Sequence, residues 1–180
     1  MQNNVIMVNG KKFRLFIPES KIQQEISRIA GEMNRDLAGR DPIFMGILNG
    51  AFMFASDLYR QITFPCQITF LKLASYSGTS STGTVKQLIG INQDLRDRLV
   101  VILEDIVDTG ETLDTIIRQL SGFQPEEIRI ATLLHKPAAA IRQVKLDYVG
   151  MEIPNDFIVG YGLDYDGYGR NFREIYQLSG

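Results

Sequence analysis

Two adjacent acids, Glu104 and Asp105, close a run of apolar residues that begins at Val100. A Thr-Gly turn at residues 108–112 follows, and a helical pattern begins behind it. Backbone N–H groups and hydroxyls at the start of a helix suit a phosphate. Paired carboxylates can hold hydroxyl groups or a hydrated metal ion. This one segment can therefore bind both ends of a sugar phosphate.

The apolar run before the acids is typical of a strand buried on both faces of a parallel sheet. Ligands of open α/β sheets bind at the carboxyl ends of such strands, which is where the acids lie. The simpler interpretation is an ordinary strand end whose acids face water and cap the next helix. The chain contains neither the G-x-x-x-x-G-K-[ST] nor the G-x-G-x-x-G pattern of nucleotide-binding loops.

Two other turns can border the same crevice. Residues 75–84 have the composition of a loop throughout and form either a surface excursion or a lid that excludes water from a reacting centre. The turn at residues 48–50 ends another apolar run, and Gly50 there allows the backbone to approach an anion closely. The simpler interpretation of this turn is that Asn49 caps the helix that follows.

Several single residues farther along the chain are also candidates. Lys136 follows a strand-like run and can point into the crevice, although a solvated lysine is the commoner case. His135 has no His or Cys nearby, so we do not expect it to bind a metal. Phe157 is either a core residue or a platform for a planar base. Asp164 can cap a turn or ligate hydrated Mg²⁺, and Arg170 has a guanidinium suited to phosphate oxygens.

The composition favours one folded domain over residues 1–180. Hydrophobic residues make up 44% of the chain, which is enough for a core, and the net charge of -2 gives no basic excess of the kind that nucleic acids attract. The single cysteine, Cys66, excludes an internal disulfide and favours a reducing, cytoplasmic location. We find no secretion signal and no apolar run long enough to span a bilayer, so we expect no membrane partner.

Strand-like and helical patterns alternate along the chain. This predicts an α/β fold with a doubly wound, mainly parallel sheet flanked by helices. Strands are expected at 12–17 (an edge strand), 43–48, 67–73, 85–91, from Val100 onward, 128–134 and 147–149, and helices at 19–37, 51–60 and 109–120. The tail from residue 157 is rich in Gly, Tyr and Asp, and we expect it to be too irregular for the core and to form a cap over the carboxyl edge of the sheet.

Residues 100–112 resemble, position by position, the phosphoribosyl pyrophosphate loop of type I phosphoribosyltransferases. The other segments occur in the order and spacing of the hypoxanthine-guanine enzymes of that family, in their bacterial form, from about Ile6 to Tyr176. Asp108 is informative, because the 6-oxopurine enzymes carry Asp there as a general base. The adenine and orotate enzymes usually carry a small residue. The resemblance implies a core at roughly residues 38–150 and a small hood from roughly residues 1–18 and 151–180.

The resemblance also implies a role for each candidate residue, with Mg²⁺ as the cofactor. The ribose 5-phosphate would be held by Glu104, Asp105, Asp108, Thr109, Gly110, Glu111 and Thr112. The purine would be bound by Lys136, Phe157 and Ile158. Pyrophosphate would be bound by Leu48, Asn49, Gly50 and Arg170. Metal ligands would be Glu104, Asp105 and Asp164, and the lid dipeptide would be Ser75 and Tyr76.

One departure from the family concerns Asn49, because Lys or Arg is frequent at that position. A neutral side chain there leaves pyrophosphate recognition more dependent on backbone N–H groups, Arg170 and Mg²⁺. The family also implies a cis peptide bond between Leu48 and Asn49 in a pyrophosphate complex, with either isomer in the free protein.

Purine salvage from phosphoribosyl pyrophosphate and hypoxanthine or guanine is therefore the leading hypothesis. The resemblance also implies a homodimer or a homotetramer, and the sequence does not distinguish them. A sister transferase for xanthine stays open, because the purine-binding tail sets that preference. A third hypothesis is an RNA-binding transcription attenuator on the same fold. Such regulators usually replace Asp108 and carry a basic face, so Asp108 and the sequence pI of about 5.5 argue against it.

Overall fold

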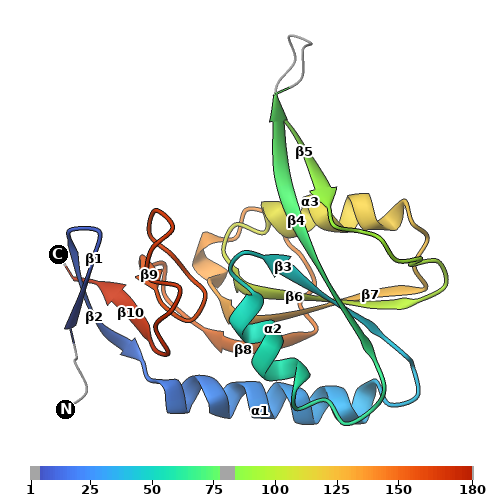
Figure 1. Cartoon of the computed structure of the whole chain (residues 1–180), viewed down its shortest axis with the longest axis horizontal. Helices are drawn as coiled ribbons and strands as arrows, with labels where there is room; N and C mark the ends of the chain where they lie inside the picture. The colour runs from blue at the N-terminus through green and yellow to red at the C-terminus, as the bar shows by residue number, and fades with distance from the viewer. Residues whose placement is uncertain (1–4, 78–83, 180) are drawn as a thin grey trace.

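The computed structural model describes residues 5–77 and 84–179 of the chain. Its main sheet has the strand order β5-β4-β3-β6-β7-β8 (Figure 1). The strands are β3 (Ile43–Leu48), β4 (Gln67–Ser77), β5 (Thr84–Ile89), β6 (Leu99–Val107), β7 (Glu127–His135) and β8 (Tyr148–Glu152). All neighbouring strands pair in parallel except β4 and β5, which pair antiparallel. The prediction of a mainly parallel sheet is confirmed.

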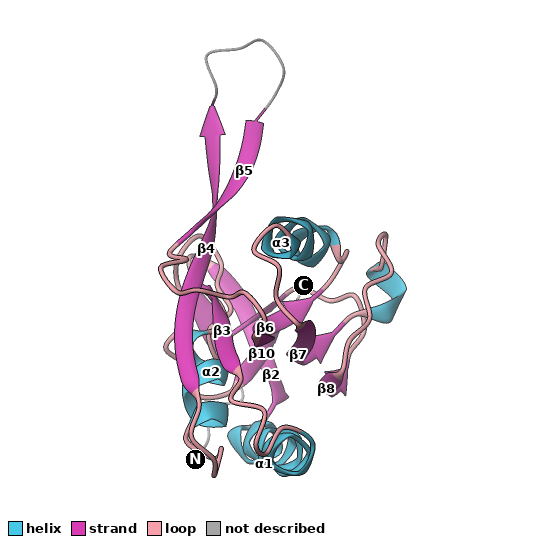
Figure 2. Ribbon diagram, turned by 90° about the vertical axis from the view of Figure 1, so that its right-hand side faces the viewer, coloured by secondary structure: helices cyan, strands magenta, loops and turns pink. Residues whose placement is uncertain are grey.

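In the described part of the chain, helices cover both faces of this sheet. They are α1 (Glu19–Asp36), α2 (Phe52–Tyr59) and α3 (Glu111–Ser121), with a short 3-10 turn η1 (Pro137–Ala139) after β7. α3 packs on one face, and α1 and α2 pack on the other (Figure 2). The sheet is thus doubly wound, and its strands are buried on both sides, which is why β3 and β6 read as continuous apolar runs. No helix of this described part is long and apolar enough to cross a membrane.

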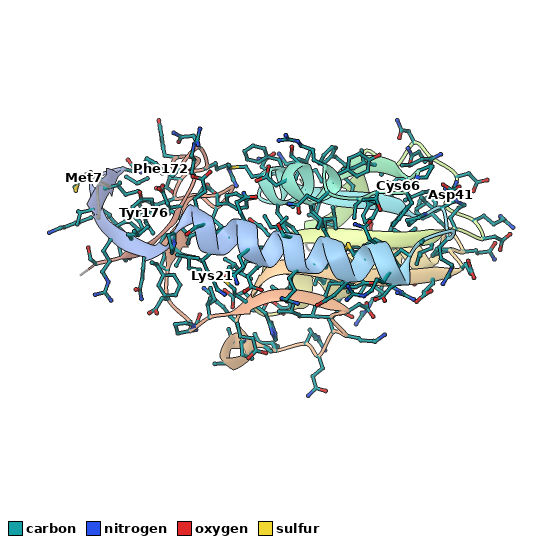
Figure 3. All side chains as sticks on the ribbon, turned by 90° about the horizontal axis from the view of Figure 1, so that it is seen from below. Met7, Lys21, Asp41, Cys66, Phe172 and Tyr176 are labelled. Carbon is teal, nitrogen blue, oxygen red and sulfur yellow. The ribbon has the colours of Figure 1, made fainter. Side chains whose placement is uncertain are left out.

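The long helix α1 forms because apolar residues recur along one face. Ile22, Ile26, Ile29 and Met33 are each 0% exposed and pack against the sheet and α2. Fully burying a side chain of this size contributes about 1.5–3 kcal/mol. In the view from below, α1 runs along the molecule from the side of Tyr176 toward the side of Cys66 (Figure 3).

A second, four-stranded antiparallel sheet forms the hood, with the order β1-β2-β10-β9. Its strands are β1 (Val5–Val8), β2 (Lys11–Ile17), β9 (Ile158–Val159) and β10 (Ile175–Leu178). The first and last segments of the chain therefore lie side by side (Figure 1). A tight turn of Asn9 and Gly10, with φ of 45° and 77°, joins β1 to β2.

The prediction of an irregular tail outside the core is wrong. The tail contributes β9 and β10, and Tyr161, Leu163 and Ile175 belong to the main hydrophobic core. The reason lies in Gly160 and Gly162, whose φ values of 104° and 95° reverse the chain sharply. These reversals bring apolar side chains inward from a segment with no regular hydrophobic period.

Two predictions about strand edges are also wrong. Residues 12–17 were expected to form an edge strand, but β2 pairs with β1 on one side and β10 on the other. Residues 75–84 were expected to form a loop throughout, but β4 continues to Ser77 and β5 begins at Thr84. Backbone groups make these pairings, so polar side chains do not prevent them. Residues 78–83 of the expected lid lie outside the described residues.

Candidate active site

A cavity of about 560 Å³ opens where the carboxyl ends of the main strands meet the hood. Most of the residues singled out from the sequence line it: Leu48, Asn49, Gly50, Glu104, Asp105, Asp108, Thr112, Lys136, Phe157, Ile158, Asp164 and Arg170. They come from β3, β6, α3, the end of β7 and the hood. The sheet therefore gathers side chains that are far apart in the sequence, as expected at the carboxyl edge of an open α/β sheet.

The acid pair lies at the floor of this cavity. Asp105 is 6% exposed, and its Oδ1 accepts the N–H of Ile106 at 2.9 Å. Glu104 is partly exposed, but its Oε2 is buried and has no hydrogen-bond partner among the described residues. Burial raises the pKa of Glu104 well above its ordinary range, and the charge of Asp105 raises it further. Burial also raises the pKa of Asp105, while contacts with Glu104 and Ile106 and the charge of Arg170 act in the opposite direction.

Two glycines bring the walls of the cavity close together. A Cβ on Gly50 would collide with the carboxylate of Asp105, so the end of β3 lies directly against the end of β6. A Cβ on Gly162 would collide with the carbonyl oxygen of Gly50, so the hood lies directly against that turn. Only residues without a side chain permit these approaches.

The turn before α3 borders a smaller, adjoining cavity of about 270 Å³, which is lined in part by Asp108, Thr109, Gly110 and Thr112. Gly110 has φ of 79°, and a Cβ there would meet the carbonyl oxygen of Arg142. The Glu111 N–H donates to Oγ1 of Thr109 at 3.4 Å, and Gly110 itself provides no side-chain cap, so the remaining N–H groups of the first turn are available to an anion. Glu111 lines neither of these two cavities and is exposed.

Lys136 is held between the ends of two strands. Its backbone N–H donates to the carbonyl of Val107 at 2.9 Å, and its side chain is only 8% exposed. The Nζ atom lies 3.5 Å from Oδ2 of Asp108, whose side chain is 46% exposed. A buried ammonium needs such a partner, because an unpaired charge away from water is costly. The pair presents a donor and an acceptor side by side in the cavity.

The Arg170 side chain is fixed by two contacts within the hood, and its partner Asp164 is held by a third. Its Nη2 lies 2.6 Å from Oδ1 of Asp164, and its Nη1 donates to the carbonyl of Gly162 at 2.6 Å. The other oxygen of Asp164 accepts the N–H of Gly167 at 2.6 Å. The guanidinium is therefore pre-oriented at the cavity wall with its charge balanced by Asp164.

Phe157 offers an aromatic face at the mouth of the cavity. The ring is 47% exposed and packs edge-to-face on Tyr165, with centroids 5.6 Å apart and planes at 86°. Phe13 supports it from the hood sheet at 6.3 Å. Ile158, the next residue, is buried in β9. A supported and half-exposed ring is suited to stacking on a planar base.

Comparisons with known proteins agree on one family. Residues 18–166 match the model of the phosphoribosyl transferase domain. The chain is 46% identical over 146 residues to the hypoxanthine-guanine phosphoribosyltransferase of Mycobacterium avium, covering 79% of this chain and 72% of that protein. It is 34% identical over 163 residues to the Streptococcus pneumoniae protein of that name, covering 90% and 89%. The chain belongs to the hypoxanthine-guanine phosphoribosyltransferase family.

A solved structure supports the same conclusion for the fold. The hypoxanthine phosphoribosyltransferase of Staphylococcus aureus matches with a TM-score of 0.85 and 32% identity, over 99% of this chain and 94% of that chain. The predicted type I phosphoribosyltransferase fold, the family and the enzyme class are therefore confirmed, and the chain is a phosphoribosyltransferase.

Three expectations about this phosphoribosyltransferase concern the remaining turns. The Leu48–Asn49 peptide bond is cis. Asn49 does not cap α2, because that helix has its N-cap at Ala51 without a side-chain hydrogen bond, so the simpler interpretation of this turn is wrong. Ser75 and Tyr76 lie at the end of β4, where they pair with Lys86 and Val85 of β5.

Sequence reasoning missed two residues that shape the site of this phosphoribosyltransferase. Gly162 closes the hood on the turn at Gly50, and Tyr161 beside it is 2% exposed. The available signal was the Gly-Tyr-Gly triplet at residues 160–162, because glycines that flank one aromatic residue indicate a sharp backbone reversal. His135, by contrast, lies outside the site cavity and borders a neighbouring one of about 530 Å³.

Proposed function

We propose that this phosphoribosyltransferase moves the 5-phosphoribosyl group of phosphoribosyl pyrophosphate to hypoxanthine or guanine, forming IMP or GMP and pyrophosphate. The observation that carries the proposal is the buried Lys136 beside Asp108, in a cavity that also holds the acid pair and adjoins the turn before α3. A cationic donor next to an acidic acceptor matches the 6-oxo group and the ring N–H of a 6-oxopurine. The relatives' names agree with this substrate class.

The base would be recognised by groups from β7 and the hood. Lys136 donates to the 6-oxo oxygen, and an adenine amino group would leave that ammonium poorly paired. Phe157 stacks on the purine face, and backbone groups at Ile158 meet its edge. Asp108 accepts the proton of the five-membered ring as the ring nitrogen attacks.

The sugar phosphate would occupy the carboxyl end of β6. The 5′-phosphate enters the smaller cavity, where N–H groups and hydroxyls of Thr109, Gly110 and Thr112 surround it. The ribose hydroxyls lie against Glu104 and Asp105. These acids also favour the positive charge that develops on the ribose as the bond to pyrophosphate breaks.

Pyrophosphate would leave on the side of β3 and the hood. Arg170 and the backbone of Leu48, Asn49 and Gly50 face that end of the cavity. With a neutral Asn49, the pre-oriented Arg170 guanidinium supplies the nearest fixed positive charge from the hood. The new bond joins the anomeric carbon to the purine nitrogen, the bond from that carbon to the pyrophosphate oxygen breaks, and the purine proton passes to Asp108.

The acids of the cavity suit Mg²⁺ that is shared with the substrate. No group of three or more metal-binding side chains occurs in residues 5–77 and 84–179, so the described chain supplies no complete cage. Glu104 carries a buried oxygen without a partner, and Asp105 lies beside it, which fits the usual pattern of one or two carboxylates plus substrate oxygens. Bound Mg²⁺ would neutralise charge on the pyrophosphate. Asp164 would be a metal ligand whose two oxygens also contact Arg170 and Gly167.

Further parts of the proposal concern the surroundings of the site. Ser75 and Tyr76 would form the lid dipeptide where β4 leaves the sheet. Identical copies of the chain would assemble as a homodimer or a homotetramer. The single cysteine supports a reducing, cytoplasmic setting.

A turnover assay with separate bases tests the function directly. Purified protein is mixed with phosphoribosyl pyrophosphate, Mg²⁺ and one of hypoxanthine, guanine, xanthine or adenine, and nucleotide formation is followed by absorbance. We expect rapid formation of IMP and GMP and negligible AMP. Faster turnover of xanthine than of hypoxanthine would make xanthine the preferred substrate and overturn the present assignment. No turnover with any base would refute the proposal.

A further inference from the structure

Tyr161 is a buried aromatic residue in the left-handed region of the backbone. Its φ is 50° and it is 2% exposed. Few L residues adopt this conformation, so surrounding contacts must hold it. Its N–H donates to the carbonyl of Phe172 at 2.9 Å, and its hydroxyl donates to Oδ2 of Asp57 at 2.6 Å. The roles proposed above do not use this hydroxyl.

Asp57 connects the hood to the helices below the cavity. It lies on α2, the helix that begins just after the turn at Gly50. Its Oδ2 also accepts from Nε2 of Gln23 on α1 at 2.8 Å. One carboxylate oxygen therefore joins α1, α2 and the hood, and hydrogen bonds to a carboxylate are among the stronger ones. Burial, followed by the contact with Asp57, raises the pKa of Tyr161 far above its ordinary range, so the hydroxyl stays a donor.

The residue after Tyr161 makes the contacts that shape the pyrophosphate end of the cavity. Gly162 lies directly against the carbonyl of Gly50. Its N–H donates to the carbonyl of Arg170 at 3.0 Å, and its own carbonyl accepts from Nη1 of Arg170 at 2.6 Å. Movement of Tyr161 would therefore move Gly162, the Arg170 guanidinium and the turn at Gly50 together.

We infer that Tyr161 and Asp57 are positioning residues for pyrophosphate recognition, an inference that rests on the proposed function. Their hydrogen bond fixes the hood turn against α2, and the turn then fixes Arg170 and the Gly50 backbone. Neither residue touches the pyrophosphate in this arrangement. At the base end of the cavity, Lys136 is held at the end of β7, and Phe157 and Ile158 are held by pairing with β10, so this end does not depend on the bond.

Tyr161→Phe removes the hydroxyl and keeps the ring, so it tests the bond and not the packing. We expect KM for phosphoribosyl pyrophosphate and the dissociation constant of pyrophosphate to rise about 10-fold, because a small misplacement of binding groups is costly. KM for hypoxanthine should change less than about 2-fold, since β7 positions Lys136 and the pairing with β10 positions Phe157 and Ile158. Asp57→Asn keeps an acceptor oxygen and should have a smaller effect. The double variant should be no worse than Tyr161→Phe alone, because both changes act on the Tyr161–Asp57 bond and the asparagine oxygen can still accept from Gln23.

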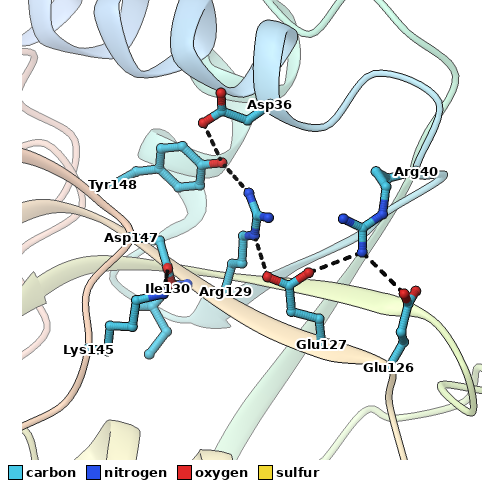
Figure 4. A network of polar contacts seen from close by, with 9 residues as sticks. All are labelled: Asp36, Arg40, Glu126, Glu127, Arg129, Ile130, Lys145, Asp147 and Tyr148. Atoms are coloured by element: carbon cyan, nitrogen blue, oxygen red, sulfur yellow. Dashed lines mark hydrogen bonds and ion pairs between the residues drawn. The ribbon is translucent and has the colours of Figure 1, made fainter.

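Tyr148 provides a matched control (Figure 4). It is 3% exposed, and its hydroxyl donates to Oδ2 of Asp36 at 3.3 Å and accepts from Nη1 of Arg129 at 3.1 Å. Both bonds lie at the amino end of β8, whereas the cavity lies at the carboxyl ends of the strands. Tyr148→Phe should lower Tm much as Tyr161→Phe does, but it should leave both KM values and pyrophosphate binding unchanged.

The kinetic comparison of Tyr161→Phe with Tyr148→Phe has three outcomes that would contradict the inference. Equal rises in both KM values for Tyr161→Phe, no change in either, or the same pattern in Tyr148→Phe would overturn the inference. Pyrophosphate binding is measured by calorimetry in the presence of Mg²⁺ and needs no turnover. A wild-type protein that binds pyrophosphate but forms no nucleotide would refute the proposed function, and the binding comparison would still decide the inference.

Discussion

The backbone of Gly50 lies against the carboxylate of Asp105 with no room for a side chain between them. This contact joins the end of β3 to the end of β6, which are neighbours in the sheet. It places the turn that we propose to bind pyrophosphate directly beside an acid that we propose to bind the ribose. Because the Asp105 carboxylate is buried, neither side can move away cheaply.

Gly50→Ala should therefore disturb the site. Its Cβ would force apart the turn and the carboxylate, so kcat/KM with phosphoribosyl pyrophosphate should fall at least about 10-fold. Overpacking should also cost about 1–3 kcal/mol of unfolding free energy. The control is Gly31→Ala inside α1, whose Cβ would meet only Arg35 at 3.8 Å. That change should keep activity and add about 0.5–1 kcal/mol of stability. A fully active Gly50→Ala enzyme would contradict the close packing.

Asp108→Asn should retain the fold and lower turnover. The amide cannot accept the purine proton as a base, and general base catalysis contributes about 10²–10⁴-fold. Steady-state kinetics with hypoxanthine would measure the change, and Tm would confirm folding. Asp114→Asn is the control, since Asp114 lies in the first turn of α3 and pairs with the exposed Arg118 at 2.7 Å. Wild-type turnover in the Asp108 variant would exclude its role as a base.

Lys136→Met should weaken purine binding selectively. Methionine keeps most of the buried volume but removes the donor to the 6-oxo group. We expect IMP or GMP affinity to fall about 10-fold or more, and phosphoribosyl pyrophosphate affinity to fall less. Calorimetry measures both. Lys145→Met is the control, because that side chain is 87% exposed and pairs with Asp147 at 2.7 Å. Equal losses for both ligands would reject the assignment of Lys136 to the base.

Glu25 on α1 gives a pH-dependent prediction about stability. It lies 2.6 Å from Nζ of Lys21 and 2.9 Å from Nε of Arg28, and the contact with Lys21 is the main cause that lowers its pKa. A lowered folded-state pKa means that this stabilisation is complete above the ordinary glutamate range near pH 4. It is lost as the pH falls through the folded-state value.

Glu25→Gln should therefore cost about 1 kcal/mol at pH 7 and progressively less below about pH 4. Urea unfolding at several pH values measures this difference. Glu126→Gln is the control, because Glu126 is 58% exposed and its ion pair with Arg40 is long, at 3.4 Å, so a change below about 0.5 kcal/mol is expected. A constant penalty for Glu25→Gln across the pH range would show that the ion pairs are not its source.

The sequence by itself determined the elements whose signals are local. The hydrophobic period of α1 and the apolar runs of β3 and β6 follow from residues that are neighbours in the chain, and each was predicted close to its observed bounds. The acid pair and the Thr-Gly turn could also be recognised, because residue types that suit a sugar phosphate follow one another within one short segment. This was sufficient to predict the sheet, the edge that carries the site and the family.

The tertiary structure alone decided how the hood closes. Tyr161 and Asp57 are 104 residues apart, and no local pattern in the sequence pairs them. The tail has no hydrophobic period from which its burial could be predicted. It is buried because Gly160 and Gly162 reverse the backbone and β10 pairs with β2. Such contacts depend on the relative placement of complete elements. A local pattern specifies an element, but packing between distant elements fixes the geometry of the site.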